Sequence, residues 1–383
     1  MKTTIGTHCT VTSSKRFRLS ERAESGVPFF CSKQIIQLEN GEIPSDYDHI
    51  TNEHFRDIQI KYGVPSAGDL LITTRGTYGI PYIYKERDCF YFADGNLTWL
   101  KDFDDCLSSH YLYYWFKSYE GQKKIDAIAK GTAQKAVPIA LIKDLQLSLP
   151  PISQQKRIAS ILSAYDDLIE NNRRQIKLLE EAAQRLYREW FVELRFPGHE
   201  SVKVVDGVPE GWKIETVGSL LRKIPRTKQV LTSDYQVSGN IPIVDQSRDF
   251  IAGYTNDTDA CVKPQDAIIV FGDHTRILKY ITFPFAKGAD GTQLIVSNSD
   301  CMPQSLFYFS IIHIDLTNYH YARHFKYLKE STILVPTKSI ANAYDNIVHP
   351  IMKRIQVLRN SCVKAKEVRD RLLPKLMSGE MEV

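Results

Sequence analysis

The clearest pattern in the chain is a seam of apolar residues, spaced by four and three positions, between Ile158 and Trp190. Charged residues lie on the other faces, and no proline or glycine follows Pro150-Pro151 until the segment has ended. Such a seam is typical of a helix that packs along a partner helix. We therefore predict one long helix over 151–193. Its seam consists of Ile158, Leu162, Tyr165, Ile169, Asn172, Ile176, Leu179, Ala183, Leu186 and Trp190.

Asn172 is the one polar residue of this seam, and a buried amide at such a position can fix the register of paired helices. At 1.5 Å per residue the helix would be about 60 Å long, too long to bury its seam alone. It therefore needs a partner helix of similar length.

A second seam appears near the C-terminus when the chain is shifted by 186 residues, which places Pro336 on Pro150. Arg369 is its polar exception, and we expect the adjacent Val368 to fill that place. Pro350 is expected to kink this helix or to mark a late start. We predict the second long helix over 338–383. Its seam consists of Tyr344, Val348, Ile351, Ile355, Leu358, Cys362, Ala365, Arg369, Leu372 and Leu376.

The segments before the two helices also repeat. "AGDLLITTRGTYGIPYIY" from Ala67 resembles "PQDAIIVFGDHTRILKYI" from Pro264, and "FADGNLTWL" is followed by an apolar segment just as "FAKGADGTQLIV" is. The predicted fold class is α+β, with globular domains over 1–150 and 194–337. Because the second domain links the two helices, they should pair antiparallel as a coiled-coil spacer, giving the repeat pseudo-two-fold symmetry.

Composition narrows the possible roles. The 383 residues are 43% hydrophobic and 25% charged, which is typical of a folded protein, and no apolar run is long enough for a membrane span or a signal peptide. We expect a cytoplasmic protein with no membrane association. The seven cysteines show no C-x-x-C spacing, which disfavours a zinc site. A net charge of +4 permits a nucleic-acid partner without demonstrating one.

The chain lacks recognisable catalytic motifs. It has no phosphate-binding G-x-x-x-x-G-K-[ST], no acidic residue two positions before a lysine, and no Asn or Asp before its one Pro-Pro pair. "GDHTR", Gly272 to Arg276, places an Asp beside a His, but two adjacent loop residues form neither a triad nor a metal site. We predict no catalytic residues, no metal and no directly bound cofactor.

The central region resembles one family. The segment "LPPISQQKRIASILSAYDDLIENNRRQIKLLEEAAQRLYREWF", followed by "DGVPEGW", is similar to the central region of specificity (S) subunits of type I restriction-modification systems. The resemblance extends over nearly the whole chain, as variable domain, helix, "VPEGW" start, second variable domain and second helix.

This resemblance implies a non-catalytic, DNA-binding subunit. S subunits carry two target recognition domains, each of which reads half of an asymmetric bipartite sequence in double-stranded DNA. They assemble with two methyltransferase (M) subunits, which carry S-adenosylmethionine and methylate adenine, and with two restriction (R) subunits, which use ATP and Mg. Trp190, Phe191 and Phe196 are expected to form local core where the second domain meets the spacer, or alternatively to contribute to an M-subunit interface.

Candidate DNA contacts follow from the chemistry of base and phosphate recognition, which uses Arg and Lys for guanine, Asn and Gln for adenine, and Lys, Arg, Ser and Thr for phosphates. In the first domain the candidates are Lys15, Arg16, Arg75, Thr77, Tyr78, Lys130, Thr132, Gln134 and Lys135. In the second domain they are His274, Arg276, His320, Arg323 and Lys326. The alternative for each of them is an ordinary solvated surface.

Two other functions remain open from the sequence. A structural coiled-coil adaptor with protein-binding end domains would show no salt-dependent DNA binding. A specificity module for a single-chain nuclease-methyltransferase would differ in the partner encoded nearby.

Overall fold

The computed structural model describes residues 2–131, 135–225, 227–318 and 323–383. The chain forms two compact units, of which unit 1 comprises 1–173 with 361–383 and unit 2 comprises 174–360. Each long helix contributes one segment to each unit. Among the described residues, none of the helices is both long and apolar enough to span a membrane.

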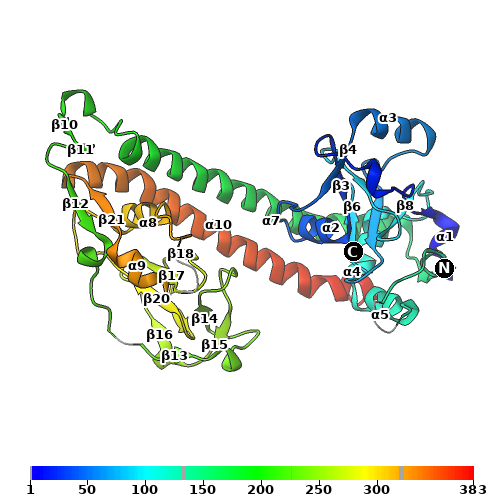
Figure 1. The fold of residues 1–383 in the computed structure, drawn as a ribbon. Coiled ribbons are helices and arrows are strands. Elements are labelled where there is room, and N and C mark those ends of the chain that lie inside the picture. The colour runs from blue at the N-terminus through cyan, green and yellow to red at the C-terminus, as the bar shows by residue number, and fades with distance from the viewer. Residues whose placement is uncertain (1, 132–134, 226, 319–322) are drawn as a thin grey trace. The chain divides into compact units, whose positions relative to one another are not determined.

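Unit 1 is built from short strands and helices that precede the first long helix (Figure 1). The strands are β1 (Lys2–Thr4), β2 (Thr10–Thr12), β3 (Val27–Phe30), β4 (Asp48–Ile50), β5 (Leu70–Thr73), β6 (Pro81–Ile83), β7 (Tyr91–Phe92), β8 (Leu97–Lys101) and β9 (Gln146–Ser148). The helices are α1 (Ile5–His8), the 3₁₀ turn η1 (Leu19–Glu21), α2 (Ser32–Glu39), α3 (Asn52–Lys61), α4 (Ser109–Lys117), α5 (Tyr119–Ile128) and α6 (Ile139–Lys143).

The central sheet of unit 1 has the order β2-β8-β5-β6, and a smaller sheet has the order β4-β3-β7. Strand β5 is buried on both faces, because alternate residues point to opposite sides of a sheet. Leu70 and Ile72 pack in the core that contains α4 and the start of the first long helix, whereas Leu71 packs in the core that contains Phe30 and Ile35. Apolar runs such as "LLI" are therefore central strands.

Unit 2 repeats this arrangement after the first long helix. Its strands are β10 (Val204–Val205), β11 (Val208–Pro209), β12 (Lys213–Thr216), β13 (Gln229–Val230), β14 (Ile241–Val244), β15 (Gly253–Thr255), β16 (Cys261–Val262), β17 (Ile268–Gly272), β18 (Leu278–Ile281), β19 (Phe285–Gly288), β20 (Thr292–Ile295) and β21 (Thr332–Val335). Its shorter helices are η3 (His199–Ser201), η4 (Val217–Leu220), η5 (Thr232–Asp234), η6 (Thr258–Ala260), α8 (Gln304–Ile312) and α9 (His324–Glu330).

Strand pairing makes the repeat explicit. The order β18-β17-β20 in unit 2 corresponds to β6-β5-β8 in unit 1, and the antiparallel pair β12-β21 corresponds to β1-β9. Strand β14 pairs antiparallel with β15 and parallel with β19, as β3 does with β4 and β7. The predicted α+β repeat is confirmed in the fold of the two units.

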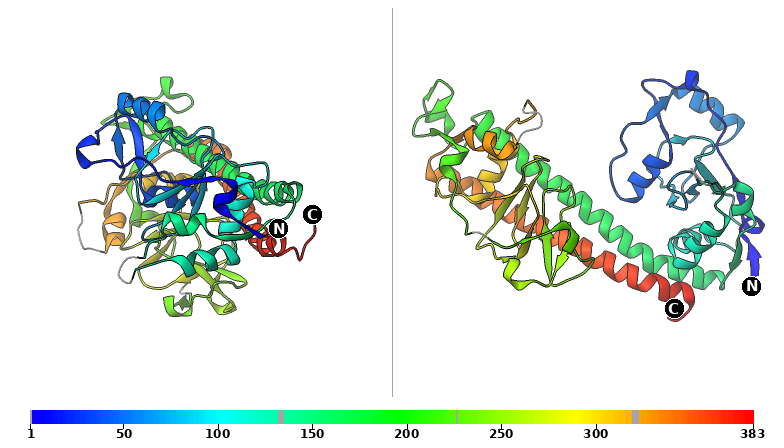
Figure 2. Two further views of the ribbon diagram at one scale, coloured as in Figure 1. Left: turned by 90° about the vertical axis from the view of Figure 1, so that its right-hand side faces the viewer. Right: turned by 60° about the horizontal axis from the view of Figure 1, so that its bottom comes forward.

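The long helices are α7 (Ile152–Tyr187), which continues into a π-helical turn η2 (Arg188–Val192), and α10 (Lys338–Ser378). Their segments run side by side in opposite directions within each unit (Figure 1; Figure 2). The expected late start at Pro350 is wrong, because α10 already begins at Lys338. Buried Tyr344, Val348 and Met352 flank the proline, and their packing offsets the hydrogen bond that it removes.

In unit 1, α7 and α10 meet through the predicted seam. Ile169 and Asn172 are buried, and the Asn172 amide donates to Ser361 Oγ at 3.0 Å. The Cys362 thiol donates to the Ile169 carbonyl at 3.7 Å, and Leu372 is partly buried against the unit 1 core.

The expectation that Val368 replaces Arg369 in the seam is wrong. Val368 is exposed, whereas the Arg369 guanidinium pairs with Asp166 of α7 and with Asp370. Asp166 also accepts the Tyr114 hydroxyl at 2.6 Å, so a hydrogen-bonded ion pair occupies a position where the pattern indicated an apolar contact.

In unit 2, Ile355 and Leu358 are buried and Ile176 and Leu179 are partly buried. The aromatic residues Trp190, Phe191 and Phe196, at and just after the end of the first long helix, belong to this core. Rings of Phe191 and Phe196 lie 5.6 and 4.7 Å from that of Trp212, and Phe191 lies 5.1 Å from Tyr344.

Candidate nucleic-acid interface

In unit 1 the structure brings two of the predicted loops together. Residues 74–79 follow β5, and Lys130 and residues 135–137 lie beside them. The Val137 amide donates to the Thr74 carbonyl at 2.8 Å and the Gly76 amide donates to the Lys135 carbonyl at 3.3 Å. Arg75 forms a β-bridge with Ala136, which also bridges Lys130. Four candidates, Arg75, Thr77, Lys130 and Lys135, are therefore exposed on adjoining backbone.

Tyr78 is only partly exposed because its ring packs against the unit 1 core. Thr132 and Gln134 lie outside the described residues.

The turn after β5 is held in one conformation. The Gly79 amide donates to the Thr73 carbonyl at 2.8 Å, and the Ile80 amide donates to Thr73 Oγ1 at 3.0 Å. Gly79 has φ +80°, which disfavours a side chain, and its carbonyl accepts the Gln122 amide at 2.8 Å. The loop that carries Arg75 and Thr77 is thus fixed from both sides before any ligand binds.

Lys15 and Arg16 are exposed on a third segment. Ser13 Oγ donates to the Leu97 carbonyl at 3.0 Å, and the Thr74 amide donates to the Asn96 carbonyl at 2.8 Å. The segment that carries Lys15 and Arg16 and the loop that carries Arg75 therefore both contact the backbone at Asn96 and Leu97. The Lys15 ammonium lies 4.5 Å from the centre of the Tyr62 ring, a cation–π contact that the sequence did not indicate.

In unit 2 the "GDHTR" loop and α9 are joined by Asp273. Its carboxylate accepts the Phe325 amide at 2.8 Å, and its carbonyl accepts the His324 amide at 3.0 Å and contacts His324 Nδ1 at 2.8 Å. Asp273 and His324 are both buried. Asp273 therefore accepts hydrogen bonds from the first backbone amides of α9, which have no acceptor within the helix itself. The contact brings together the two predicted segments, with His274, Arg323 and Lys326 exposed on them.

Arg276 is positioned differently from the other candidates. It adopts φ +62°, and its guanidinium donates to the Leu316 carbonyl at 3.2 Å. It remains exposed, but part of its donor capacity is used within the protein. His320 lies outside the described residues.

Sequence reasoning missed the segment 245–249, "DQSRD", which contacts the "GDHTR" loop. The Gln246 side chain accepts the His274 amide at 3.1 Å and donates to the Asp290 carbonyl at 2.9 Å. A run of polar residues after an apolar strand was the available signal, but the corresponding connection in the first domain contains helix α2 instead.

One group of potential metal ligands occurs among the described residues, namely His8, Asp104 and Cys106, whose ligand atoms lie within 4.8 Å of one another. Both ring nitrogens of His8 already have protein partners, Thr3 Oγ1 at 2.9 Å and Asp104 at 2.8 Å. Burial raises the pKa of Asp104, but hydrogen bonds from His8 and from the Cys106 amide outweigh it and lower the pKa overall. The group connects α1 to the loop after β8.

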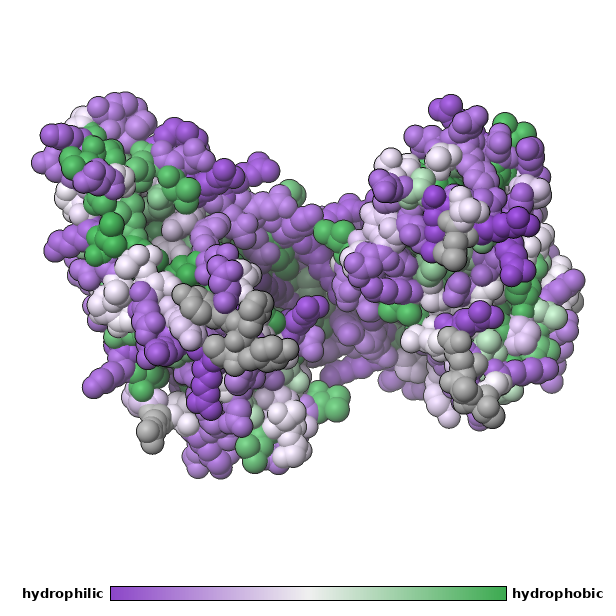
Figure 3. Space-filling model, in the orientation of Figure 1, coloured by the Kyte–Doolittle hydropathy of each residue, from purple (hydrophilic) through white to green (hydrophobic). Residues whose placement is uncertain are grey.

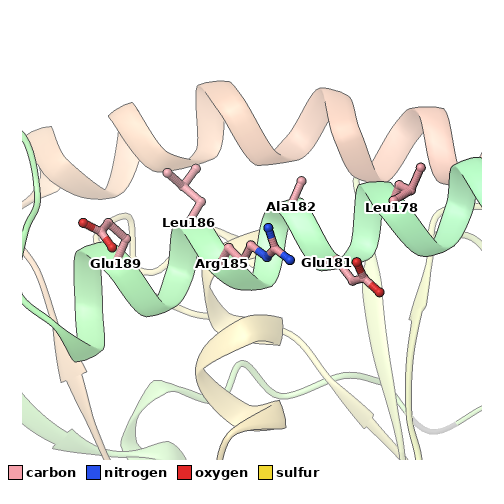
Figure 4. Close-up of a pocket in the computed structure, with 6 residues that line it drawn as sticks. All are labelled: Leu178, Glu181, Ala182, Arg185, Leu186 and Glu189. Carbon is pink, nitrogen blue, oxygen red and sulfur yellow. The ribbon is translucent and has the colours of Figure 1, made fainter.

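A shallow pocket of about 450 Å³ follows one side of α7 in unit 2 (Figure 4). All of its lining side chains project from successive turns of this one helix: Leu178, Glu181, Ala182, Arg185, Leu186 and Glu189. Across the face shown in Figure 3, hydrophilic residues dominate and apolar residues form small separate groups. Such a groove, walled by a single helix, offers little enclosure for a small ligand.

Comparison with known proteins gives consistent results. The family described as "Type I restriction modification DNA specificity domain" matches residues 3–181. The Type I restriction enzyme MjaIX specificity subunit of Methanocaldococcus jannaschii is 24% identical over 401 residues, which span 97% of this chain and 90% of that protein. A putative type I restriction enzyme specificity subunit of Haemophilus influenzae, S.HindORF215P, is 30% identical over 181 residues, 47% of this chain and 43% of that one.

Among solved structures, the S subunit of a type I restriction-modification system from M. genitalium has a similar fold. Its TM-score is 0.64 with 16% identity, over 98% of this chain and 95% of that chain.

Proposed function

Because this chain is a specificity subunit of a type I restriction-modification system, with a DNA sequence-specificity role, we propose that it reads a split, asymmetric sequence with two separate domains. The observation that carries this proposal is the repeated strand topology, which presents a comparable cluster of exposed loops in each unit. The two domains are assigned to 1–150 and 194–337, and the spacer helices to 151–193 and 338–383.

The exposed loop residues support DNA as the ligand. In unit 1, Arg75, Lys130 and Lys135 place three cations on adjoining backbone, and cations in this arrangement neutralise phosphates. The loops carry different residues in the two units, "RGTYG" in one and "GDHTR" in the other. Different loops imply different half-sites, so the complete target is not a palindrome.

Catalysis is assigned to partner subunits. M subunits would supply S-adenosylmethionine and transfer the methyl group, and R subunits would supply the ATP- and Mg-dependent steps, with two of each bound. The long helices carry exposed apolar residues that suit a partner's helices, namely Leu168, Leu178, Val357, Val363 and Val368.

The test is co-expression with the neighbouring methyltransferase gene, followed by sequencing of methylated adenines in the host DNA. The expected result is methylation at a two-part, non-palindromic motif. Binding of the assembled complex should weaken steeply with salt, because phosphate contacts release counterions. Absence of any motif together with salt-independent binding would refute the proposal.

The partner interface is tested with Leu178→Asp. Leu178 is 64% exposed, so the change should leave the melting temperature of the chain unaltered. It should nevertheless abolish co-purification with the methyltransferase subunit. Normal co-purification would exclude this part of α7 from the interface.

A further inference from the structure

The segment 245–250 of unit 2, "DQSRDF", lies between β14 and β15, whereas the connection between the corresponding strands β3 and β4 of unit 1 is longer and contains helix α2. There, β3 leads almost directly into this helix. A connection that differs between two otherwise matching domains is a natural place for a recognition property that belongs to one domain alone.

A buried lysine holds the two ends of the "DQSRD" part of this loop. Lys279 stands in strand β18, and its side chain is only 4% exposed. Its ammonium donates to the Asp245 carbonyl at 2.8 Å and to the Asp249 carbonyl at 2.5 Å, and it lies 3.8 Å from the Asp245 carboxylate. Burying a charge is costly unless it is hydrogen-bonded, so these contacts stabilise one loop conformation.

Gln246 connects this loop to two others. Besides its side-chain bonds to His274 and Asp290, its carbonyl accepts the Thr275 hydroxyl at 2.6 Å. Gly291 has φ +80°, and a Cβ there would lie 2.8 Å from both the Gln246 amide nitrogen and the His274 ring. The Gln246 side chain and carbonyl therefore hold the three loops in close contact at this one point.

The far end of the loop is also anchored. The Phe250 ring lies 6.0 Å from that of Phe283 and 4.2 Å from the Arg359 guanidinium on α10. Arg359 in turn pairs with Glu180 of α7 at 2.6 Å. The loop is thus fixed to the sheet at one end and to the helix pair of unit 2 at the other.

Arg248 projects into solvent from this anchored loop. It is exposed, and among the described residues its guanidinium has no hydrogen bond or ion pair. The nearby Asp249 and Asp290 are exposed as well, and their negative charge opposes contact with phosphates. A guanidinium on a rigid loop with acidic neighbours is better suited to the acceptor edge of guanine, to which it can bond through two donors.

We propose that Arg248 reads a guanine in the half-site of the second domain and that Lys279 is the positioning residue that holds its loop. This inference rests on the proposed function and extends it to one loop and one base type. Arg248 touches the base, whereas Lys279 acts only through the loop backbone.

The experiment compares methylated motifs made by the complete complex with wild-type chain, Arg248→Ala, Lys279→Met and the control Lys213→Ala. Lys213 is exposed on β12, whose partner strand is β21 rather than any strand of the loop cluster. Arg75→Ala identifies the half-site read by the first domain. Binding is measured in parallel on duplexes with each base of the motif changed singly.

With Arg248→Ala, discrimination at one guanine of the second half-site should fall about 5- to 150-fold, while the first half-site and the control stay unchanged. Lys279→Met should relax the same position and leave the other bases of that half-site recognised. A merely structural lysine would instead weaken the whole half-site.

An unchanged motif with Arg248→Ala would overturn the proposal, as would a uniform loss of affinity on every duplex, which indicates a phosphate contact. Loss of the entire second half-site with Lys279→Met would overturn its positioning role. If the wild-type complex yields no split motif, it is the proposed function that fails, before any variant is compared.

Discussion

The ion pair between Arg369 and Asp166 predicts a measurable loss of stability when one partner is removed. Their side chains are 14% and 26% exposed, so water screens the pair less than a surface pair. Breaking a fully buried pair costs about 3–5 kcal/mol, and an exposed pair contributes about 0–1. Since Asp166 keeps the Tyr114 hydroxyl, we expect Arg369→Met to cost about 2–3 kcal/mol.

For a unit of roughly 200 residues, this loss corresponds to a decrease of about 4–12 °C in melting temperature by calorimetry of the full chain. The double variant Asp166→Asn/Arg369→Met should lie within about 1 kcal/mol of wild type, because it leaves no unpaired buried charge; Asp370, the other partner of Arg369, is 50% exposed and stays solvated. Arg371→Met is the control, since Arg371 is exposed on the same helix. A shift below about 2 °C for Arg369→Met, or additive losses in the double variant, would refute the reasoning.

Three further predictions concern unit 1. Gln155→Ala should lower the free energy of unfolding in urea by about 2–4 kcal/mol, because the buried Gln155 side chain accepts the Ser108 amide and donates to the Cys106 and Pro150 carbonyls at 2.9–3.0 Å. An unchanged midpoint would argue against this role. Burial raises the pKa of the Cys9 thiol to about 12, so iodoacetamide at pH 8 should label exposed Cys106 and spare Cys9 until unfolding, and equal rates by peptide mass mapping would contradict this. Lys135→Ala should weaken binding and reduce the salt slope by about 0.9 if Lys135 neutralises a phosphate, as a titration over several salt concentrations would reveal.

The candidate DNA contacts were predictable as segments and not as individual roles. Side-chain chemistry alone selected the "GDHTR" and Arg323–Lys326 segments, and the structure brings them together through Asp273. Side-chain chemistry could not indicate that the Arg276 guanidinium donates to the Leu316 carbonyl, because that acceptor is 40 residues away in the chain. The 245–249 loop was missed for the same reason, because the residues that contact it are distant in sequence and lie in β18 and in two other turns.

The sequence by itself determined the two long helices, the repeat and the α+β class. These follow from the spacing of apolar residues, because that spacing reflects the period of a helix or a strand and depends only on residues close together in the sequence. Tertiary structure decided how exceptions to those patterns are accommodated. Pro350 stays within α10 because packed neighbours support it. Arg369 is only partly exposed and Lys279 is buried, because partners distant in sequence satisfy their charges. A buried charge is tolerated or not according to what surrounds it in space, and only the folded chain contains that information.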